Sequence, residues 1–285
     1  MLEFIKNNIG LSIVLLCLFL GLVAFIAWIL WSNKAIKLSE VSIKAPLDLK
    51  IIQISDYHNA YFKNNLEKPL ALIRDAEPDI IVITGDFIDS RHTNLKRSIA
   101  FATELVKIAP CYYTPGNHES RMPREYTALV DTLEELGVCV LCDSSITLDA
   151  HGVPYTLIGV EDPMFEIKKN DSVEKVKVVV RNKLQELIKN DDTYKIVLCH
   201  RPEAFSIYVQ AGVDLAFTGH AHGGQVQIPF VGGLIAPNQG FFPKYTQGTH
   251  TSGKTTMIIS RGIGNSLCPI RVNNRPEIIL ANLNK

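Results

Sequence analysis

Short apolar runs alternate with segments of helical periodicity along most of the chain. The runs are rich in β-branched and aromatic residues, which is typical of buried strands. They read LKIIQIS, DIIVITG, CYYTPG, YTLIGV, YKIVLCH and VDLAFTGH, followed by the pair TTMIISRG and EIILANL. Between them the spacing of apolar positions predicts helices over 66–76, 98–108, 123–136 and 173–188. Strands whose apolar faces are covered by helices predict an α/β domain.

The N-terminal segment lacks this alternation. Residues 9–31 form an uncharged apolar run of about 23 residues, long enough to cross a hydrocarbon core of about 30 Å. Trp28 and Trp31 at its end suit a membrane–water interface. A cleaved signal peptide is the alternative, but its apolar part usually has about 7 to 15 residues, and no small-x-small site follows here. We therefore expect 1–32 to be a transmembrane anchor.

The segment between the anchor and the first predicted strand is polar. We expect a linker over 33–48 and a catalytic domain over 49–285. Three lysines follow the apolar run within this segment, whereas one lysine and the N-terminal amine precede the run. By the positive-inside rule this small excess favours a cytoplasmic catalytic domain. The expected location is therefore the cell membrane, with a single pass.

Composition excludes some classes of partner. The chain has 285 residues, 47% hydrophobic and 20% charged, which is enough for a sizeable core. Its formal net charge is zero and it has no Lys/Arg run, so we expect no nucleic-acid partner. The six cysteines do not form the pattern of a secreted disulfide framework. Cys139 and Cys142 match C-x-x-C, but they fit an apolar strand better than a redox pair, and no second C-x-x-C supports a zinc ribbon.

Side chains that bind metal ions follow five of the predicted strands. In open α/β sheets, ligands bind at the carboxyl ends of the strands, so these side chains are expected to meet. Each turn alone is ordinary turn chemistry, but five in succession are not. Neutral imidazole and carboxylates are common ligands of divalent cations. In chain order the residues are Asp56 and His58, Asp86 and Asp89, Asn117 and His118, His200, and His220 and His222.

The order D-x-H, G-D-x-x-D, G-N-H-E, H and G-H-x-H resembles the calcineurin-like metallophosphoesterase superfamily, from about residue 49 to the C-terminus. The stretches GHAHGGQVQIPFVGG, APNQGFFPKYTQG, SRGIGNS and RPEI look like its bacterial membrane-anchored or exported branch, typified by YkuE and YaeI. Some UDP-diacylglucosamine pyrophosphatases are similar to that branch. Tyr57, where Leu is frequent, and Ala221, where Thr is frequent, depart from the pattern without touching a ligand position.

This resemblance implies a four-layer α/β/β/α sandwich preceded by one transmembrane helix. It also implies two divalent metal ions, Mn, Fe, Zn or Mg, bridged by the Asp86 carboxylate. Such a pair clamps the attacking and leaving oxygens of an in-line displacement at phosphorus. His118 would face the phosphate as a general acid or charge stabiliser. One ion would be held by Asp56, His58 and His222, and the other by Asn117, His200 and His220.

Three other features have two interpretations each. Asp89 either orients a metal-binding imidazole from outside the ligand set or caps a helix. Arg261 and the glycine-flanked amides around it either bind an anion or form a tight turn. The stretch from Phe230 to Phe242 is either a hydrophobic wall near the site or a packed loop, and the second is favoured.

The function expected from these observations is hydrolysis of a phosphodiester or pyrophosphate bond. Tethering to a membrane raises the effective concentration of a substrate confined there, so we expect a lipid or lipid-linked phosphoester. A UDP-diacylglucosamine pyrophosphatase-like activity is one form of this. The alternative is a non-catalytic membrane-bound binding or scaffolding protein on the same fold. Such a protein would be expected to have lost Asp86 or His118, and both are present.

Overall fold

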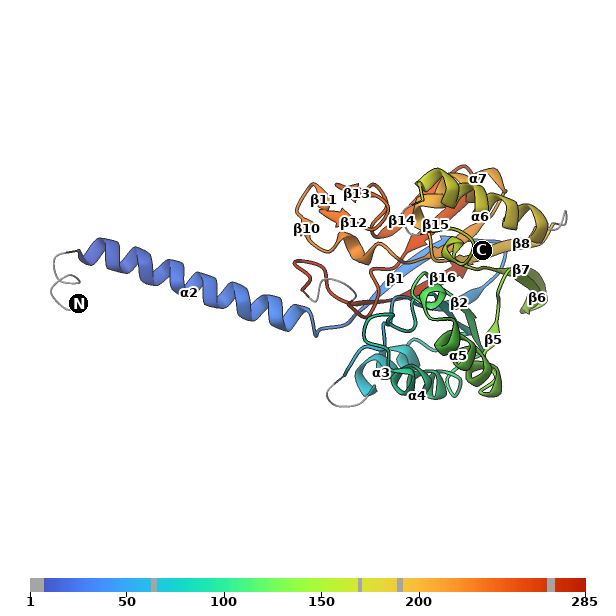
Figure 1. Cartoon of the computed structure of the whole chain (residues 1–285), viewed down its shortest axis with the longest axis horizontal. Coiled ribbons are helices and arrows are strands. Elements are labelled where there is room, and N and C mark those ends of the chain that lie inside the picture. The colour runs from blue at the N-terminus through green and yellow to red at the C-terminus, as the bar shows by residue number, and fades with distance from the viewer. Residues whose placement is uncertain (1–7, 63–65, 169–170, 189–191, 266–269) are drawn as a thin grey trace.

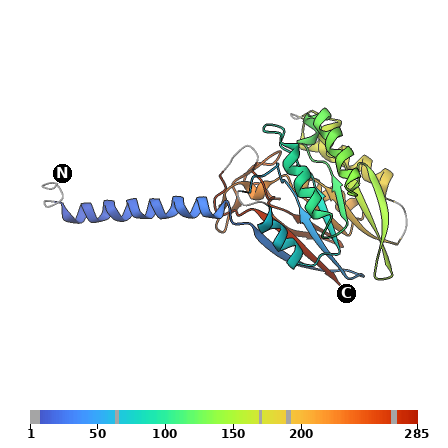
Figure 2. The same ribbon diagram turned by 90° about the horizontal axis from the view of Figure 1, so that it is seen from below.

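A computed structural model describes residues 8–62, 66–168, 171–188, 192–265 and 270–285. Two six-stranded sheets stack against each other, helices cover their outer faces, and the long helix α2 (Ile9–Ser32) projects from the domain (Figure 1). Figure 2 shows the same arrangement from below, with α2 leaving one end of the layered domain. The four-layer α/β/β/α sandwich expected from the sequence is confirmed.

The first sheet has a mainly parallel centre. Its strands β2 to β5 run parallel, and β16 is antiparallel to β2 and parallel to β1. Both faces of the sheet are covered: in the third strand Ile81 and Ile83 pack against helices, whereas Ile80 and Val82 face the second sheet. Such strands read as continuous apolar runs. The order is β1 (Lys37–Lys44), β16 (Glu277–Asn284), β2 (Leu49–Ile54), β3 (Ile80–Thr84), β4 (Cys111–Thr114) and β5 (Cys139–Val140).

The second sheet has a parallel centre between two antiparallel edges. Strands β7, β8, β9 and β15 are parallel, and β6 and β14 pair antiparallel at the edges. Two small hairpins follow β9. The order is β14 (Gly248–Ser252), β15 (Thr255–Ile259), β9 (Leu215–Thr218), β8 (Tyr194–Cys199), β7 (Val153–Val160) and β6 (Ser144–Ala150). The hairpins are β10 (Gln227–Ile228) with β11 (Gly232–Gly233), and β12 (Ile235–Ala236) with β13 (Gly240–Phe241).

Helices bury their apolar stripes on the outer faces of the sheets. Leu129 and Leu133 of α5 join the cluster on the first sheet, and Val180 and Leu184 of α6 join the cluster on the second. Each such side chain contributes about 1.5 to 3 kcal/mol on burial. The helices are α3 (Glu67–Asp75), α4 (Leu95–Leu105), α5 (Pro123–Glu135), α6 (Val173–Leu187) and α7 (Phe205–Gln210). Short 3₁₀ turns are η1 (Glu119–Arg121), η2 (Pro163–Phe165), η3 (Pro202–Ala204) and η4 (His222–Gly224).

Helix α2 has the length and composition of a membrane span. At about 1.5 Å per residue its 24 residues extend about 36 Å. Within the described residues it is the one helix long and apolar enough to cross a membrane. Its apolar side chains are exposed rather than packed on the domain. The hydrophobic run seen in the sequence therefore does not belong to the core.

The segment 33–48, expected to be a linker, contains strand β1, and this expectation is corrected. β1 pairs with β16 along its whole length, from Lys37 opposite Glu277 to Lys44 opposite Asn284. The signal is the two-residue spacing of Val41 and Ile43, which pack in the cluster between the sheets. The high proportion of polar residues in 33–48 as a whole obscures this alternation.

Only four residues separate α2 from β1, and they are bonded to the domain. The Asn33 side chain donates from Nδ2 to the Arg271 carbonyl (2.7 Å) and accepts at Oδ1 from the Arg271 N–H (2.8 Å). Arg275 donates to the carbonyl oxygens of Ala35 and Ile36, and its guanidinium lies over the Trp31 ring. The end of α2 is thus attached directly to the catalytic domain.

Candidate metal centre

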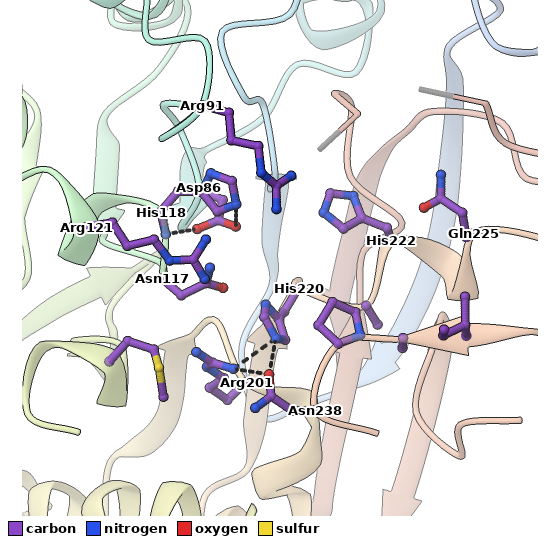
Figure 3. A pocket seen from close by; sticks show the side chains of 15 residues that line it. Asp86, Arg91, Asn117, His118, Arg121, Arg201, His220, His222, Gln225 and Asn238 are labelled. Atoms are coloured by element: carbon purple, nitrogen blue, oxygen red, sulfur yellow. Dashed lines mark hydrogen bonds and ion pairs between the residues drawn. The ribbon is translucent and has the colours of Figure 1, made fainter. Parts of the chain in front are cut away.

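Residues that follow five strands meet in one buried cluster, and those after β3, β4 and β9 line a cavity beside it. They come after β2, β3 and β4 of the first sheet and after β8 and β9 of the second. Figure 3 shows several of them around this cavity. The structure brings together all eight residues for which the sequence predicts a metal or catalytic role, and buries each of them: Asp56, His58, Asp86, Asn117, His118, His200, His220 and His222.

The backbone of this cluster is strained. Five of its residues have a left-handed φ, a conformation that costs a non-glycine residue about 1 to 2 kcal/mol. Gly219 shows why the cluster needs glycines: a Cβ there would lie 1.9 Å from Ser55 Oγ and 2.4 Å from Asp56 Oδ2. Strain of this kind gathers at functional sites. The five are Asp56 (49°), His58 (48°), Asp86 (51°), His220 (64°) and His222 (47°).

Asp56, His58 and His222 form the first group of possible donors. The two imidazole Nε2 atoms are 3.4 Å apart, and Asp56 Oδ1 lies 3.3 Å from His222 Nε2 and 3.8 Å from His58 Nε2. Burial lowers the pKa of His58 to about 3 and that of His222 to about 4. Both rings are therefore neutral at pH 7, which is the form that binds metal ions.

Asp86, His200 and His220 form the second group. His200 donates from Nδ1 to the Thr84 carbonyl (2.8 Å), so the neutral ring turns its Nε2 lone pair towards Asp86 Oδ2, 3.2 Å away. His220 Nε2 lies 2.9 Å from Arg201 Nη1 and 3.1 Å from Asn238 Oδ1, and its Nδ1 faces Asn117. Such hydrogen bonds orient metal-binding imidazoles.

Asn117 completes this second group. Its side-chain amide lies 2.7 Å from His220 Nδ1. With the amide oxygen on that side, two acceptor atoms face each other, as two ligands of one cation do. A metal ion, rotation of the amide, or a proton on His220 Nδ1 that donates to the amide oxygen each resolves such a contact.

The chemistry of the donors fits a pair of cations. Among the residues that the structure describes, Asp56 Oδ1 and His200 Nε2 are buried without a hydrogen-bond partner. The carboxylates of Asp56 and Asp86 are also buried, so positive charge is needed among them. Burial lowers the pKa of His200, but Asp86 and Asp56 outweigh it and raise that pKa to about 10. The carboxylates thus stabilise a proton on His200, and they would stabilise a divalent ion at the same position in the same way.

His118 forms a third group of possible donors with His58 and Asp86, so geometry alone does not exclude it from binding metal. The Ser90 N–H donates to its Nδ1 (3.0 Å), so the neutral ring carries its proton on Nε2, 3.9 Å from Asp86 Oδ2. Asp89 Oδ1 lies 3.3 Å from Nδ1. Burial lowers the pKa of His118, but Asp86 and Asp89 outweigh it and raise the pKa. Asp89 therefore contacts His118 and not one of the predicted ligand imidazoles, and Asn94 rather than Asp89 caps α4.

Glu119, the residue after His118, holds the Asp86 loop. Its buried carboxylate accepts hydrogen bonds from the backbone N–H groups of Asp86, Phe87, Ile88 and Gly116, at 2.7 to 3.1 Å. Burial and Asp86 raise its pKa to about 7, against the lowering effect of the N–H donors. The sequence did not predict this positioning role. In the sequence Glu119 is only the last residue of the G-N-H-E motif, and nothing local shows that it contacts the Asp86 loop.

The cavity beside the cluster has a volume of about 470 Å³ and a cationic mouth. Arg91 and Arg121 line it and are exposed, and both point towards the cluster in Figure 3. Ile235, Ala236 and Pro237 of the β12 hairpin form an apolar part of its wall. The cavity therefore suits an anion with an apolar neighbour. The stretch from Phe230 to Phe242, for which a packed loop was favoured, lies partly on this wall and partly in solvent.

Arg201 is a buried cation that sequence reasoning missed. It forms two hydrogen bonds with the Asp162 carboxylate, at 2.6 and 2.8 Å, and its Nη1 lies 2.9 Å from His220 Nε2. Asp162 follows β7 of the second sheet. The sequence predicted site residues after the neighbouring strands β8 and β9, but none after β7. The sequence signal that could have been used is Asp162 itself, a carboxylate that follows a sixth strand in the same way as the predicted site residues.

Arg261 does not line the cavity. Its Nη2 lies 2.7 Å from Glu277 Oε1, which favours the structural interpretation of its loop.

Cys139 and Cys142 are free thiols, and Cys139 belongs to β5, as the strand interpretation predicts. Burial raises the pKa of Cys142 to about 11, so the thiolate needed for redox chemistry is disfavoured.

Comparison with known proteins identifies the scaffold and the type of chemistry. The family model described as Calcineurin-like phosphoesterase matches residues 49–224. The chain belongs to this family. Metallophosphoesterase YkuE of Bacillus subtilis (strain 168) is 31% identical over 260 residues, 87% of this chain and 85% of that protein. Phosphodiesterase YaeI of Escherichia coli (strain K12) is 27% identical, over 82% of each chain.

A solved structure agrees at the level of the fold. TT1561 of Thermus thermophilus superposes with a TM-score of 0.52 at 17% identity, over 76% of this chain and 92% of that one. As a calcineurin-like phosphoesterase the chain is an enzyme, a metal-dependent hydrolase of phosphoester bonds. Its buried Asp and His cluster could hold a dinuclear metal site. The resemblance seen in the strand-end motifs is thus confirmed.

Proposed function

We propose that the chain is a membrane-anchored phosphoesterase that cleaves a phosphodiester or pyrophosphate bond in a lipid or lipid-linked substrate. The observation that carries this is a groove of about 620 Å³, which is lined by Asn33 and Lys34 at the end of α2 and by His58 of the metal cluster. A molecule held in the bilayer beside α2 has in this groove a route to the reacting groups. A UDP-diacylglucosamine pyrophosphatase-like reaction has such a substrate.

The anchor supports this substrate class. Helix α2 is long and apolar enough to span a bilayer, and four residues separate it from the first sheet. The active site therefore stays within a short distance of the membrane, where lipid substrates are concentrated. The name of YaeI, a phosphodiesterase, supports a diester as the bond that is cleaved. The lysine count on the two sides of the run favours a cytoplasmic domain.

The cluster would hold two divalent ions, with Asp86 as the shared ligand. Oxygen and imidazole donors suit Mn, Fe, Zn or Mg. Ions bound there would act as Lewis acids that stabilise charge on the phosphoryl group. The proposed ligands are Asp56, His58 and His222 for one ion, and Asn117, His200 and His220 for the other.

The remaining steps belong to side chains of this chain. Arg91 and Arg121 at the mouth of the cavity bind and orient the phosphate oxygens. His118 donates the proton on Nε2 to the leaving oxygen as the bond from that oxygen to phosphorus breaks, and the Ser90 N–H keeps its ring in place. A general acid of this kind contributes typically ~10²–10⁴-fold. The apolar wall from the β12 hairpin excludes water from one side of the substrate.

The test uses the full chain reconstituted in vesicles. Each of the four metals is supplied in turn with p-nitrophenyl phosphate, bis-p-nitrophenyl phosphate or a vesicle-embedded nucleoside-diphosphate lipid. We expect hydrolysis of the lipid and of the soluble diester, and a slower reaction with the monoester. Preference for the soluble monoester would contradict the lipid proposal, and inactivity towards the embedded lipid with every metal would refute it.

A groove variant separates lipid access from chemistry. Ala60 lines the groove, and Ala60→Trp should slow hydrolysis of the embedded lipid while sparing bis-p-nitrophenyl phosphate, which enters by the mouth of the cavity. Ala100→Trp, on the exposed side of α4, is the matched control. Equal rates for the lipid in both variants would show that the groove is not the route.

A further inference from the structure

The two small hairpins expose an unusual amount of apolar surface. We call Phe230, Val231, Ile235, Phe241 and Phe242 the hairpin patch; their exposed fractions are 110%, 61%, 41%, 71% and 63%. In the rest of the described domain, outside α2 and the hairpin patch, three large apolar side chains are exposed, namely Tyr61, Val178 and Ile270. Apolar surface concentrated in this way marks an interaction site.

The backbone of the patch is strained as well. Phe230 and Phe242 have φ values of 66° and 51°, in a region that bulky residues rarely adopt. Both rings are directed to solvent instead of the core, so no packing within the described residues offsets this cost.

The patch lies on the side of the domain from which α2 leaves. Hairpins β10–β11 and β12–β13 are at that end in Figure 1. Hydrogen bonds connect the two features: Asn33 at the end of α2 bonds to the Arg271 backbone, and the next residue, Val272, accepts from the Gln227 N–H of β10. The hairpin tips and the membrane helix are thus attached to the same segment.

The composition of the hairpins selects a lipid bilayer over a protein partner. The stretch 226–243, VQIPFVGGLIAPNQGFFP, has no charged residue. Entry of this stretch into the interfacial layer would therefore bury no charge. Cations lie beside it instead: Lys244 directly follows the stretch, 5.1 Å from the Tyr245 ring, and Arg275 lies over Trp31 at the end of α2. Aromatic and basic residues together are typical of the membrane interface.

We propose that the hairpin patch inserts into the interfacial layer of the same bilayer that α2 spans, and so fixes the catalytic domain on the membrane. This inference rests on the proposed membrane anchor. The β12 hairpin also lines the catalytic cavity through Ile235, Ala236 and Pro237. Docking by the patch therefore places the mouth of the cavity at the level of the lipid headgroups.

The experiment measures the depth of the patch in the full chain. A polarity-sensitive fluorescent amino acid replaces Phe241, and the protein is reconstituted in vesicles of phosphatidylethanolamine and phosphatidylglycerol at a ratio of about 3:1. The matched control carries the same amino acid at Val178, an exposed apolar position on α6. We expect a blue-shifted emission at position 241 that brominated lipids quench several-fold more than the emission at position 178.

Two outcomes would overturn the inference, and they differ. If the protein does not float with the vesicles, the anchor fails and the docking fails with it. If the protein floats, but position 241 is as exposed to water and as little quenched as position 178, the anchor stands and the docking alone is wrong. Because both labelled positions are exposed, the labels leave the core unchanged.

Discussion

Glu119→Gln is the substitution whose effect follows most directly from the hydrogen bonds. The carboxylate accepts two backbone N–H groups at each oxygen: Oε2 from Asp86 and Gly116, and Oε1 from Phe87 and Ile88. An amide can offer an acceptor to one of these pairs and must turn its own NH₂ group towards the other. Two buried donors then lose their acceptor, at about 1 to 3 kcal/mol each, or about 2 to 6 kcal/mol in all.

This loss is measured by thermal unfolding of the full chain in detergent at pH 8, followed by near-ultraviolet circular dichroism. At about 2 to 4 °C per kcal/mol for a domain of this size, the midpoint should fall by about 4 to 24 °C. Glu125→Gln, at an exposed position in the first turn of α5, is the matched control. Since the Asp86 loop is released, bound metal should also decrease. Equal midpoints and metal contents in the two variants would refute the reasoning.

Three further predictions concern single residues. Asp86→Ala should abolish hydrolysis and lower the metal content, because it removes the proposed shared ligand; near-normal activity with added Mn²⁺ would contradict this. His118→Ala should keep both metals and lose about two decades of turnover or more, most for poor leaving groups, and loss of a metal ion would place His118 among the ligands. Burial lowers the pKa of Lys183, but its contacts with Asp143 (2.7 Å) and Glu166 (2.9 Å) outweigh this and raise it. Its stabilising effect should therefore persist up to about pH 10.4, the value in the unfolded chain, and be lost above it. Above about pH 10.4, the unfolding midpoint of the unchanged chain should fall steeply with pH, and the midpoint of Lys183→Met should fall less steeply.

The sequence predicted the parts of the site that depend on strand ends. Ligand-type residues directly after apolar runs lie at the carboxyl edge of a parallel sheet, so Asp56 and Asp86 of the first sheet could be placed together without coordinates. That His200, after β8 of the second sheet, joins them depends on how the two sheets stack. The four predicted helices on the sheet faces also occur within three residues of the expected bounds. These elements follow from local periodicity, which a single sequence contains.

Features that depend on contacts far apart in the chain could not be predicted in this way. Arg201 is paired with Asp162, and nothing local shows that the two side chains meet. Asn33 and Arg271 are 238 residues apart, so their hydrogen bonds could not be read from composition around α2. The linker expectation for 33–48 overlooked a local signal as well, because β1 alternates Val41 and Ile43 within an otherwise polar stretch.

The position of β16 has consequences for the assembly of the protein. This strand, eight residues close to the C-terminal end of the chain, lies between β1 and β2, which are near the start of the domain. The first sheet can therefore close only after almost the entire domain has been synthesised, while α2 has long been available for insertion. Without residues 277–284, β1 and β2 would be separated by two strand spacings, about 9.5 Å, with no hydrogen bonds between them. The C-terminal strand thus belongs to the interior of the molecule, and a nascent chain that stops short of it would leave an incomplete sheet attached to α2.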